Sequence, residues 1–320
     1  MSTPTDDTIK LFTGNANPEL AREVADYLGL GLGRVTVTKF ADGEAHVVIG
    51  ESVRGSDVFL IQSLSRPVND HIMELLVMMD ALRRASARSI TAVIPYYAYA
   101  RQDRQDRPRT PITAKLLADL VTTAGASRVM AMDLHAGQIA GFFGQPVEHM
   151  YGSRVLIEEM RRLAGDDLER TVVVSPDAGG VERARYVSSK LGVGLAIIDK
   201  RRPRPNVSEV MHVIGDVEDR HAFIVDDMID TAGTLCSAAS ALKRNGAIEV
   251  SAFATHGLFN GPAIERIDAS DLARVCVTNT VPLLENAQQC ERIHKLSVGS
   301  TIGEAIKRVH GEASVSSLWA

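Results

Sequence analysis

Short runs rich in β-branched residues alternate with helical segments along most of this 320-residue chain. The expected strands cover residues 57–61, 89–94, 128–132, 171–174, 195–198, 222–225, 250–254 and 274–277. The expected helices cover residues 69–85, 111–124, 152–163, 180–191 and 231–245. Alternation at this spacing predicts an α/β fold, with mainly parallel sheets flanked by helices on both faces.

The expected strands are too many for one open sheet, and a division near Tyr151 gives two halves of similar size. We therefore predict two domains, residues 9–150 and residues 151–310. In open α/β sheets, ligands gather beyond the carboxyl ends of the strands. Functional residues are accordingly expected in the segments that follow strands.

Composition excludes several classes of protein. The formal net charge of -5 argues against a general binder of nucleic acid or membranes. No stretch approaches the ~20 apolar residues of a membrane helix, and the polar residues 1–8 lack the core of a signal peptide. The three cysteines are odd in number and lack metal-ligand spacing, which disfavours disulfides and zinc. A soluble cytoplasmic protein is expected.

The run from Phe223 to Thr234 reads FIVDDMIDTAGT, an apolar strand followed by acids and then by small residues that open a helix. Backbone N–H groups at such a turn, with the partial positive charge of a helix start, can hold a phosphate. Asp226 and Asp227 would repel phosphate, so they are expected to accept hydrogen bonds from sugar hydroxyls. An N-capped turn with surface acids is the simpler interpretation, but phosphate and diol together describe a phosphorylated ribose.

Further polar segments follow other strands. Residues 39–44, KFADGE, are typical of a hairpin turn, although Phe40 beside two acids could stack on a base. Residues 99–109 form a locally basic loop whose guanidinium groups suit polyphosphate, or which is simply solvated. His135 and Asp177 each follow a strand and could hold a divalent cation that phosphates already hold in part.

A second basic segment, DKRRPRPN, covers residues 199–206, and its alternating prolines predict an extended loop without internal hydrogen bonds. Its cations could stabilise charge on a transferring phosphoryl group. The chain has no Gly-x-x-x-x-Gly-Lys-Ser/Thr segment, and residues 29–34 fail the Gly-x-Gly-x-x-Gly pattern. A P-loop kinase and a dinucleotide-dependent dehydrogenase are therefore unsupported.

Taken in order, these segments resemble the ribose-phosphate diphosphokinase (phosphoribosyl diphosphate synthetase) family. The similarity extends over residues 11–318 and includes NPELA at 17–21, VRGSDVFLIQS at 53–63, PVNDHIMELL at 67–76 and IPYYAYARQDR at 94–104. It implies two tandem phosphoribosyltransferase-like domains, with ATP bound by the first and ribose 5-phosphate by the second. It also implies transfer of the diphosphoryl group of MgATP to the C1 hydroxyl of ribose 5-phosphate, with AMP released.

The resemblance assigns roles residue by residue. ATP is expected at Phe40, Asp42, Gly43, Glu44, Arg101, Gln102 and Asp103. Ribose 5-phosphate is expected at Arg202, Asp226, Asp227, Asp230, Thr231, Ala232, Gly233 and Thr234. Lys200 and Arg202 are the expected catalytic cations, and His135 and Asp177 the expected ligands of one or two Mg²⁺ ions, one carried with ATP.

The resemblance further implies a homo-oligomer, a hexamer, and members of the family that phosphate activates and ADP inhibits. Those members carry a C-terminal Ser-Val-Ser-Tyr-Leu-Phe-like segment, in which this chain has Ser317 for the tyrosine and Trp319 for the phenylalanine. Ala41 also replaces a usual serine. Two alternatives share the fold: a phosphoribosyltransferase, which consumes the activated sugar, and a non-catalytic subunit associated with the synthetase.

Overall fold

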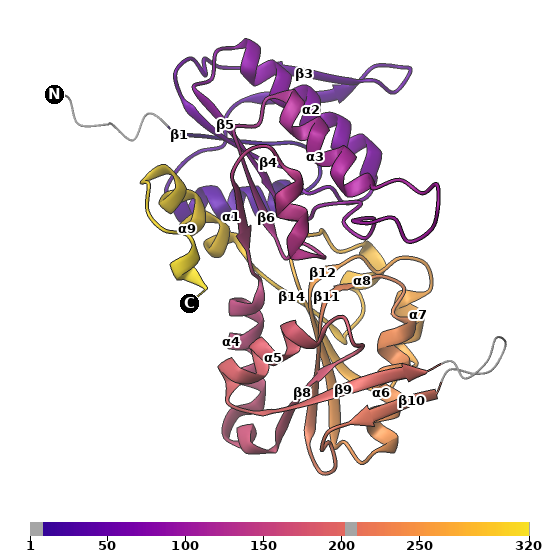
Figure 1. Cartoon of the computed structure of the whole chain (residues 1–320). Helices are drawn as coiled ribbons and strands as arrows, with labels where there is room; N and C mark the ends of the chain where they lie inside the picture. Colours follow the sequence, from indigo (N-terminus) through magenta and orange to yellow (C-terminus); the bar gives the residue numbers. More distant parts are fainter. Residues whose placement is uncertain (1–8, 202–209, 320) are drawn as a thin grey trace. The chain divides into compact units, whose positions relative to one another are not determined.

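The computed structural model describes residues 9–201 and 210–319, which form two compact units (Figure 1). The described part of unit 1 comprises residues 9–151, 280–282 and 298–319, and that of unit 2 comprises residues 152–201, 210–279 and 283–297. The sequence prediction assigned residues up to 310 to the second domain. The structure differs at this end, because the chain returns to unit 1.

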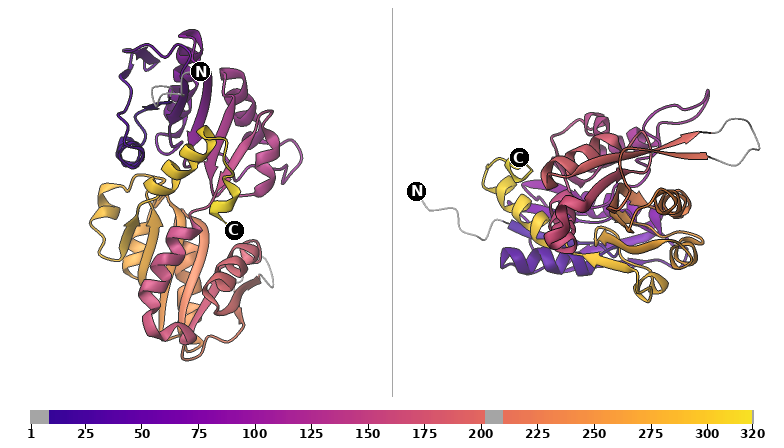
Figure 2. Two further views of the ribbon diagram at one scale, coloured as in Figure 1. Left: turned by 90° about the vertical axis from the view of Figure 1, so that its left-hand side faces the viewer. Right: turned by 90° about the horizontal axis from the view of Figure 1, so that it is seen from below.

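The chain returns to unit 1 because its last α-helix buries one face there. Helix α9 (Gly299–His310) buries Ile302 and Ile306 and packs against α1 (Pro18–Leu28), as Figures 1 and 2 show. Tyr27 Oη of α1 donates a hydrogen bond to Glu304 Oε2 at 3.0 Å. A Cβ added at Gly303 would lie 2.5 Å from the Tyr27 ring, so this helix contact requires the glycine.

Unit 1 is built on a parallel sheet with strand order β1-β4-β5-β6-β7. These strands are β1 (Ile9–Thr13), β4 (Asp57–Ile61), β5 (Ser89–Ile94), β6 (Arg128–Met132) and β7 (Val147–Met150). A separate antiparallel hairpin joins β2 (Val35–Lys39) to β3 (Ala45–Ile49). The remaining helices are α2 (Val68–Arg84) and α3 (Thr113–Ala124), with short 3-10 segments at Gly137–Phe142 and Ser316–Leu318.

Unit 2 holds a sheet with strand order β10-β9-β8-β11-β12-β13-β14, parallel except where β9 meets β10. The strands are β8 (Thr171–Ser175), β9 (Gly194–Arg201), β10 (Val210–Ile214), β11 (His221–Ile229), β12 (Glu249–Gly257), β13 (Leu272–Thr278) and β14 (Ile293–Leu296). The helices are α4 (Ser153–Ala164), α5 (Val181–Leu191), α6 (Gly233–Arg244), α7 (Ala263–Asp268) and α8 (Glu285–Gln288), with a 3-10 segment at Gly165–Arg170.

Both faces of the unit 2 sheet are covered. Val172, Ile224 and Ala252 point toward α6 and α7, where they form one core cluster. Val173, Phe223 and Phe253 point the other way, toward α4 and α5, and form a second cluster. Because strand side chains alternate between faces, a strand buried on both sides must be apolar throughout. The predicted α/β fold with mainly parallel, helix-flanked sheets is confirmed.

Within the described residues, no helix is both long and apolar enough to cross a membrane. Cys236, Cys276 and Cys290 are free thiols. Burial raises the pKa of the Cys276 thiol to about 12, so this group stays protonated and unreactive in the core.

Candidate active site

The strand order of unit 2 reverses direction at β8 and β11. The chain passes from β8 through α5 to β9 on one side, and β11 then pairs with the other side of β8. Such a reversal separates the two following loops and leaves a crevice at the carboxyl ends of the strands, where α/β proteins bind ligands. The segments predicted to hold Asp177 and the phosphorylated ribose follow these two strands.

Strand β11 is longer than the sequence suggested. It pairs with β8 as far as Ile224, opposite Val174, and then continues along β12 to Ile229. Asp226 and Asp227 were expected to follow the strand, but they lie within it. Pairing with β12 sustains the extended backbone there, while the side toward β8 is unpaired beyond Ile224 and leaves the acids beside the open crevice.

Asp226 and Asp227 share one cation. Nη1 of Arg183, from α5, lies 3.3 Å from Asp226 Oδ1 and 3.7 Å from Asp227 Oδ1. Asp227 is buried, and its backbone N–H donates to Asp226 Oδ1 at 2.8 Å. Burial raises the pKa of Asp226, the neighbouring Asp227 carboxylate raises it further, and Arg183 opposes both. The net effect raises the pKa of Asp226 to about 8, so this carboxyl becomes a charged acceptor for a diol only as pH rises through that value.

Residues from other segments hold the start of the turn from Asp230 to Thr234. Asn260 donates from Nδ2 to Asp230 Oδ1 at 2.7 Å and from its backbone N–H to Asp230 O at 2.9 Å. Arg266 Nη1 donates to Thr231 O at 2.9 Å. These contacts hold Asp230 and Thr231, the first two residues of the turn, without a bound ligand.

Helix α6 begins at Gly233 with a start suited to an anion. Its N-cap residue, Ala232, has a left-handed φ of 57° and no side-chain acceptor for the first-turn N–H groups. The hydroxyl-bearing residues Thr231 and Thr234 are both exposed beside it. N–H groups at a helix start, threonine hydroxyls and the helix dipole are together suited to binding a phosphate. The expected site at 230–234 therefore has a geometry that fits a phosphate.

Asp177 lies in the turn between β8 and α5. Its Oδ1 accepts from the backbone N–H of Gly180 at 2.9 Å, and its carbonyl accepts from Ser175 Oγ at 2.7 Å. The side chain is exposed, and its orientation is set by the turn. Mg²⁺ commonly binds one or two carboxylates together with waters and substrate phosphates. A single held carboxylate fits that mode, and within 9–201 and 210–319 no three His, Cys, Asp or Glu side chains gather into a metal site.

Lys200 lies in the second half of β9, where its backbone pairs with Met211 of β10. The predicted loop without internal hydrogen bonds is wrong for 199–201, because these residues form a β-ladder with β10. Since β8 pairs with β9 only as far as Ile197, Lys200 lies beyond the carboxyl end of β8, at the same edge of the sheet as Asp177. Arg202 lies outside the described residues.

In unit 1, Phe40, Asp42, Gly43 and Glu44 form the tip of the β2–β3 hairpin. Phe40 N–H donates to Glu44 O at 2.9 Å, and Gly43 has a φ of 95° that favours glycine. Glu44 N–H donates to Asp42 Oδ1 at 3.1 Å. The hairpin interpretation is thus confirmed, and the turn leaves the Phe40 side chain 53% exposed, as a base-stacking residue requires.

Arg101, Gln102 and Asp103 lie between β5 and α3. Gln102 Oε1 accepts from Thr113 Oγ1 at 2.5 Å, and Gln102 O accepts from Ala114 N–H at 3.2 Å. Asp103 Oδ2 accepts from Gln138 Nε2 at 2.6 Å. The loop is therefore tied to the start of α3, while the Arg101 side chain is exposed at its surface.

His135 follows β6 in unit 1 and is exposed. The preceding residues are well held: Asp133 N–H donates to Met150 O at 2.9 Å, and Leu134 N–H donates to His149 Nε2 at 3.0 Å. His135 thus belongs to unit 1 and Asp177 to unit 2.

Sequence reasoning missed Arg183 and Asn260, which contact the acids of the ribose segment. Arg183 occupies the first turn of the helix that follows Asp177, so its place near the strand ends was a usable signal. Asn260 follows β12 in the segment Leu258–Asn260, whose N–H groups bond back to Ile229 and Asp230. Its sequence surroundings, FNGP, indicate only a turn.

Comparison with known proteins agrees with this geometry. The family described as the N-terminal domain of ribose phosphate pyrophosphokinase matches residues 9–125, and the phosphoribosyl synthetase-associated domain matches residues 201–320. Ribose-phosphate pyrophosphokinases of Nitrosomonas europaea and Bacillus subtilis are 53% and 55% identical to this chain, each over 98% of both chains.

A solved structure is also similar. The crystal structure of phosphoribosylpyrophosphate synthetase from Mycobacterium smegmatis matches with a TM-score of 0.90 and 42% identity, covering 96% of this chain and 100% of that one. Identity at this level over the full length of relatives, together with both domain matches, shows the family. The chain belongs to the ribose-phosphate pyrophosphokinase family.

Proposed function

We propose that this protein transfers the diphosphoryl group of MgATP to the C1 hydroxyl of ribose 5-phosphate, giving 5-phosphoribosyl 1-diphosphate and AMP. The observation that carries the proposal is that β11 carries the acid pair Asp226–Asp227 near its end and is followed by an uncapped helix start. Asp226 and Asp227 bind the ribose hydroxyls, and residues 230–234 bind the 5-phosphate.

The C1 oxygen attacks the β-phosphorus, the bond from that phosphorus to the bridging oxygen of AMP breaks, and the hydroxyl proton leaves the sugar. Catalysis rests on positioning and on cations around the transferring group.

The residues of unit 1 bind the nucleotide. Phe40 stacks on adenine, Asp42, Gly43 and Glu44 surround the base and ribose, and Arg101, Gln102 and Asp103 contact ATP. Lys200 and Arg202 stabilise the developing charge, and Arg202 also contacts ribose 5-phosphate.

His135 and Asp177 would hold Mg²⁺, as one or two ions, one of them arriving with ATP. The metal would supply charge neutralisation to the phosphate oxygens. The protein residues contribute an exposed imidazole and a carboxylate held by Gly180, while phosphates and water complete the shell.

A direct assay tests the proposed activity. We expect ATP and Mg²⁺ to yield AMP when ribose 5-phosphate is added, and no AMP without it. A phosphoribosyltransferase would instead consume 5-phosphoribosyl 1-diphosphate with a base, and a non-catalytic subunit would do neither. Omission of Mg²⁺ should abolish turnover. Coupled measurement of AMP over time separates these three outcomes.

Arg183 is proposed as a positioning residue for the acid pair. Arg183→Gln removes the cation within 3.3 Å of Asp226, so the two carboxylates repel each other and the ribose hydroxyls lose an acceptor. We expect the KM for ribose 5-phosphate to rise about tenfold, in line with the loss of one charged hydrogen bond. Arg183→Lys keeps the positive charge and should retain part of the affinity for ribose 5-phosphate. Arg185→Gln, on an exposed position of the same helix, is the matched control and should leave this KM unchanged.

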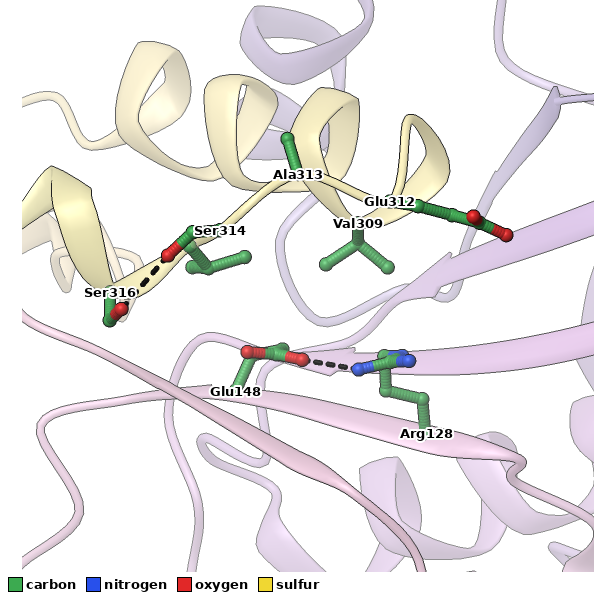
Figure 3. A pocket seen from close by; sticks show the side chains of 8 residues that line it. Arg128, Glu148, Val309, Glu312, Ala313, Ser314 and Ser316 are labelled. Carbon is green, nitrogen blue, oxygen red and sulfur yellow. Dashed lines mark hydrogen bonds and ion pairs between the residues drawn. The ribbon is translucent and has the colours of Figure 1, made fainter.

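The C-terminal segment is the proposed place of control by phosphate and ADP. Residues 312–316 line a cavity of about 550 Å³ with Arg128, Glu148 and Val309 (Figure 3). Arg128 and Glu148 form an ion pair there, and the hydroxyls of Ser314 and Ser316 lie 2.9 Å apart. The substituted residues pack locally: Ser317 Oγ donates to Ser314 O at 3.0 Å, and the Trp319 ring meets Tyr151 edge-on.

Two measurements test these proposals. The rate of AMP formation as a function of phosphate concentration tests control by phosphate, and sizing in solution tests the expected hexamer.

A further inference from the structure

The segment that follows β12 stays bonded to the turn that is proposed to bind the 5-phosphate. This segment comprises residues 258–266 and runs into helix α7. Leu258 N–H donates to Ile229 O at 2.9 Å, and Asn260 N–H donates to Asp230 O at 2.9 Å. The backbone pairing between the two chain segments therefore continues past the end of the β-ladder and reaches the first residue of the turn.

Phe259 anchors this segment in the core of unit 2. Its side chain is buried, and its φ of 47° is left-handed, a conformation that bulky residues adopt when their surroundings enforce it. Phe259 belongs to the same buried cluster as Ala232, the N-cap residue of α6, and Ile264 of α7. A Cβ added at Gly257 would lie 2.6 Å from the Phe259 ring, so the packing there is close. The core thus fixes the backbone at the residue before Asn260.

The Asn260 side chain acts on the charge of the turn. Its Nδ2 donates to Asp230 Oδ1 at 2.7 Å, and both residues are half-buried. Asp230 carries a negative charge at the beginning of a turn that is proposed to hold a phosphate, and like charges at short range repel. A donor at this distance fixes one oxygen of the carboxylate, and so fixes the direction of its charge relative to the turn.

Arg266 of α7 holds the next residue of the turn. Its Nη1 donates to Thr231 O at 2.9 Å, and a Cβ added at Gly233 would lie 3.2 Å from the same nitrogen. The guanidinium group therefore lies against the backbone of the turn and brings a positive charge to it. Asn260 and Arg266 thus hold two consecutive residues of the turn, and both belong to the segment 258–266.

We propose that residues 258–266 are the positioning element for the phosphate turn: Asn260 fixes the carboxylate of Asp230, and Arg266 fixes the carbonyl of Thr231. Neither Asn260 nor Arg266 contacts the substrate in this proposal. Their effect is to order the turn before ribose 5-phosphate arrives, which lowers the cost of ordering it on binding. The inference rests on the proposed function, in which residues 230–234 bind the 5-phosphate.

Asn260→Asp is the decisive variant, because it keeps the shape of the side chain and replaces the donor with a carboxylate. Assayed at pH ~8, where an ordinary carboxyl is ionised, it sets two carboxylates against each other at the Asp230 contact. We expect the KM for ribose 5-phosphate to rise about 10- to 100-fold. The KM for ATP and kcat should change less than about twofold, because only ground-state binding of the sugar phosphate is weakened.

Asn260→Ala distinguishes positioning from packing. It removes the donor without adding a charge, so we expect the KM for ribose 5-phosphate to rise only about 3- to 10-fold. A role in packing alone predicts the opposite order, since aspartate fills the volume of asparagine and alanine does not. Arg266→Gln tests the second contact at an exposed position and should also raise this KM about 3- to 10-fold. Arg266→Lys keeps a charged donor and should have a smaller effect.

Asn245→Ala is the matched control, since it removes an asparagine hydrogen bond, from Nδ2 to Ala241 O at 2.8 Å, at the other end of α6. It should leave the KM for ribose 5-phosphate unaltered even where it lowers the Tm. An unchanged KM in Asn260→Asp or in Arg266→Gln, or a smaller effect of Asn260→Asp than of Asn260→Ala, would overturn the proposal.

Failure of the proposed function gives a different result. The unmodified chain would then release no AMP from ATP and ribose 5-phosphate. Calorimetric titration of the unmodified chain and the same variants with ribose 5-phosphate would still measure whether the segment 258–266 controls the affinity. A chain that binds ribose 5-phosphate without transferring the diphosphoryl group would refute the activity alone, whereas a chain that binds none would also refute the positioning role.

Discussion

Lys200→Ala is expected to lower kcat by roughly 10²–10³-fold while the KM for ribose 5-phosphate stays near its original value. Loss of a cation that acts on the developing phosphoryl charge costs about 3–4 kcal/mol of transition-state stabilisation. The backbone of Lys200 lies in β9, beyond the carboxyl end of β8. Steady-state rates of AMP formation, with ribose 5-phosphate varied at saturating MgATP, measure both quantities.

Lys190→Ala provides the control for Lys200. It removes the same charge from unit 2, but Lys190 lies on α5 with its Nζ over the Tyr186 ring at 5.6 Å. Its kcat should match that of the unmodified protein. An unchanged kcat in Lys200→Ala, or a kcat equally reduced in both variants, would remove Lys200 from the catalytic group.

Asp226→Asn is expected to raise the KM for ribose 5-phosphate by about 10- to 100-fold. At a pH above the raised pKa of Asp226, the change removes a charged acceptor for sugar hydroxyls, and hydrogen bonds to charged groups contribute about 1.5–3 kcal/mol. The KM for ATP should change little, because the proposed nucleotide residues belong to unit 1. Kinetics with each substrate varied in turn show whether the loss is confined to the sugar.

The pH dependence distinguishes Asp226 from its neighbours. Burial and Asp227 raise its pKa above the ordinary value, so the ionised acceptor forms only as pH rises through that higher pKa. The KM for ribose 5-phosphate should therefore fall with rising pH in the unmodified protein, and this dependence should flatten in Asp226→Asn. Because the sugar phosphate itself titrates near pH ~6, comparison of the two proteins above pH ~7 isolates the carboxyl group.

The free energy of unfolding should fall as pH rises, whereas binding of ribose 5-phosphate should improve. Partial unfolding therefore cannot explain the expected change in KM. The folded protein binds the Asp226 proton more tightly than the unfolded chain, so this group lowers the free energy of unfolding as pH rises from its ordinary pKa through the raised one. Asp226→Asn removes that penalty. Its Tm at neutral pH should be no lower than that of the unmodified protein; a marked drop would mean that the acid serves the fold.

The strands predicted from sequence are those with a continuous apolar run. Arg128–Met132 and Ser89–Ile94 are buried at every position after the first, and strands covered on both faces are near-continuous apolar runs. Among the strands that the sequence analysis missed, β7 (VEHM) and β14 (IHKL) lie at sheet edges and mix charged with apolar residues. Edge strands need less apolar surface, so their local pattern is uninformative.

The candidate site also contains residues that the sequence predicts and residues that it does not. The sequence predicted the acids and small residues of the Asp226–Thr234 run and the Phe40 hairpin, because strand ends and turns have local sequence signals. Arg183 and Asn260 were not predicted, since each acts through a partner tens of residues away. From the sequence, an arginine or asparagine of the site cannot be distinguished from any other exposed one, because its partner is known only from the fold.

The sequence by itself determined the alternation of strands and helices, and with it the segments that lie at strand ends. It also determined the functional groups of those segments, which are carboxylates and threonine hydroxyls next to the start of a helix. The tertiary structure alone decided that β11 continues past β8, that one arginine serves two acids, and that the last helix joins unit 1. Each of these depends on packing between distant residues, which no local pattern encodes.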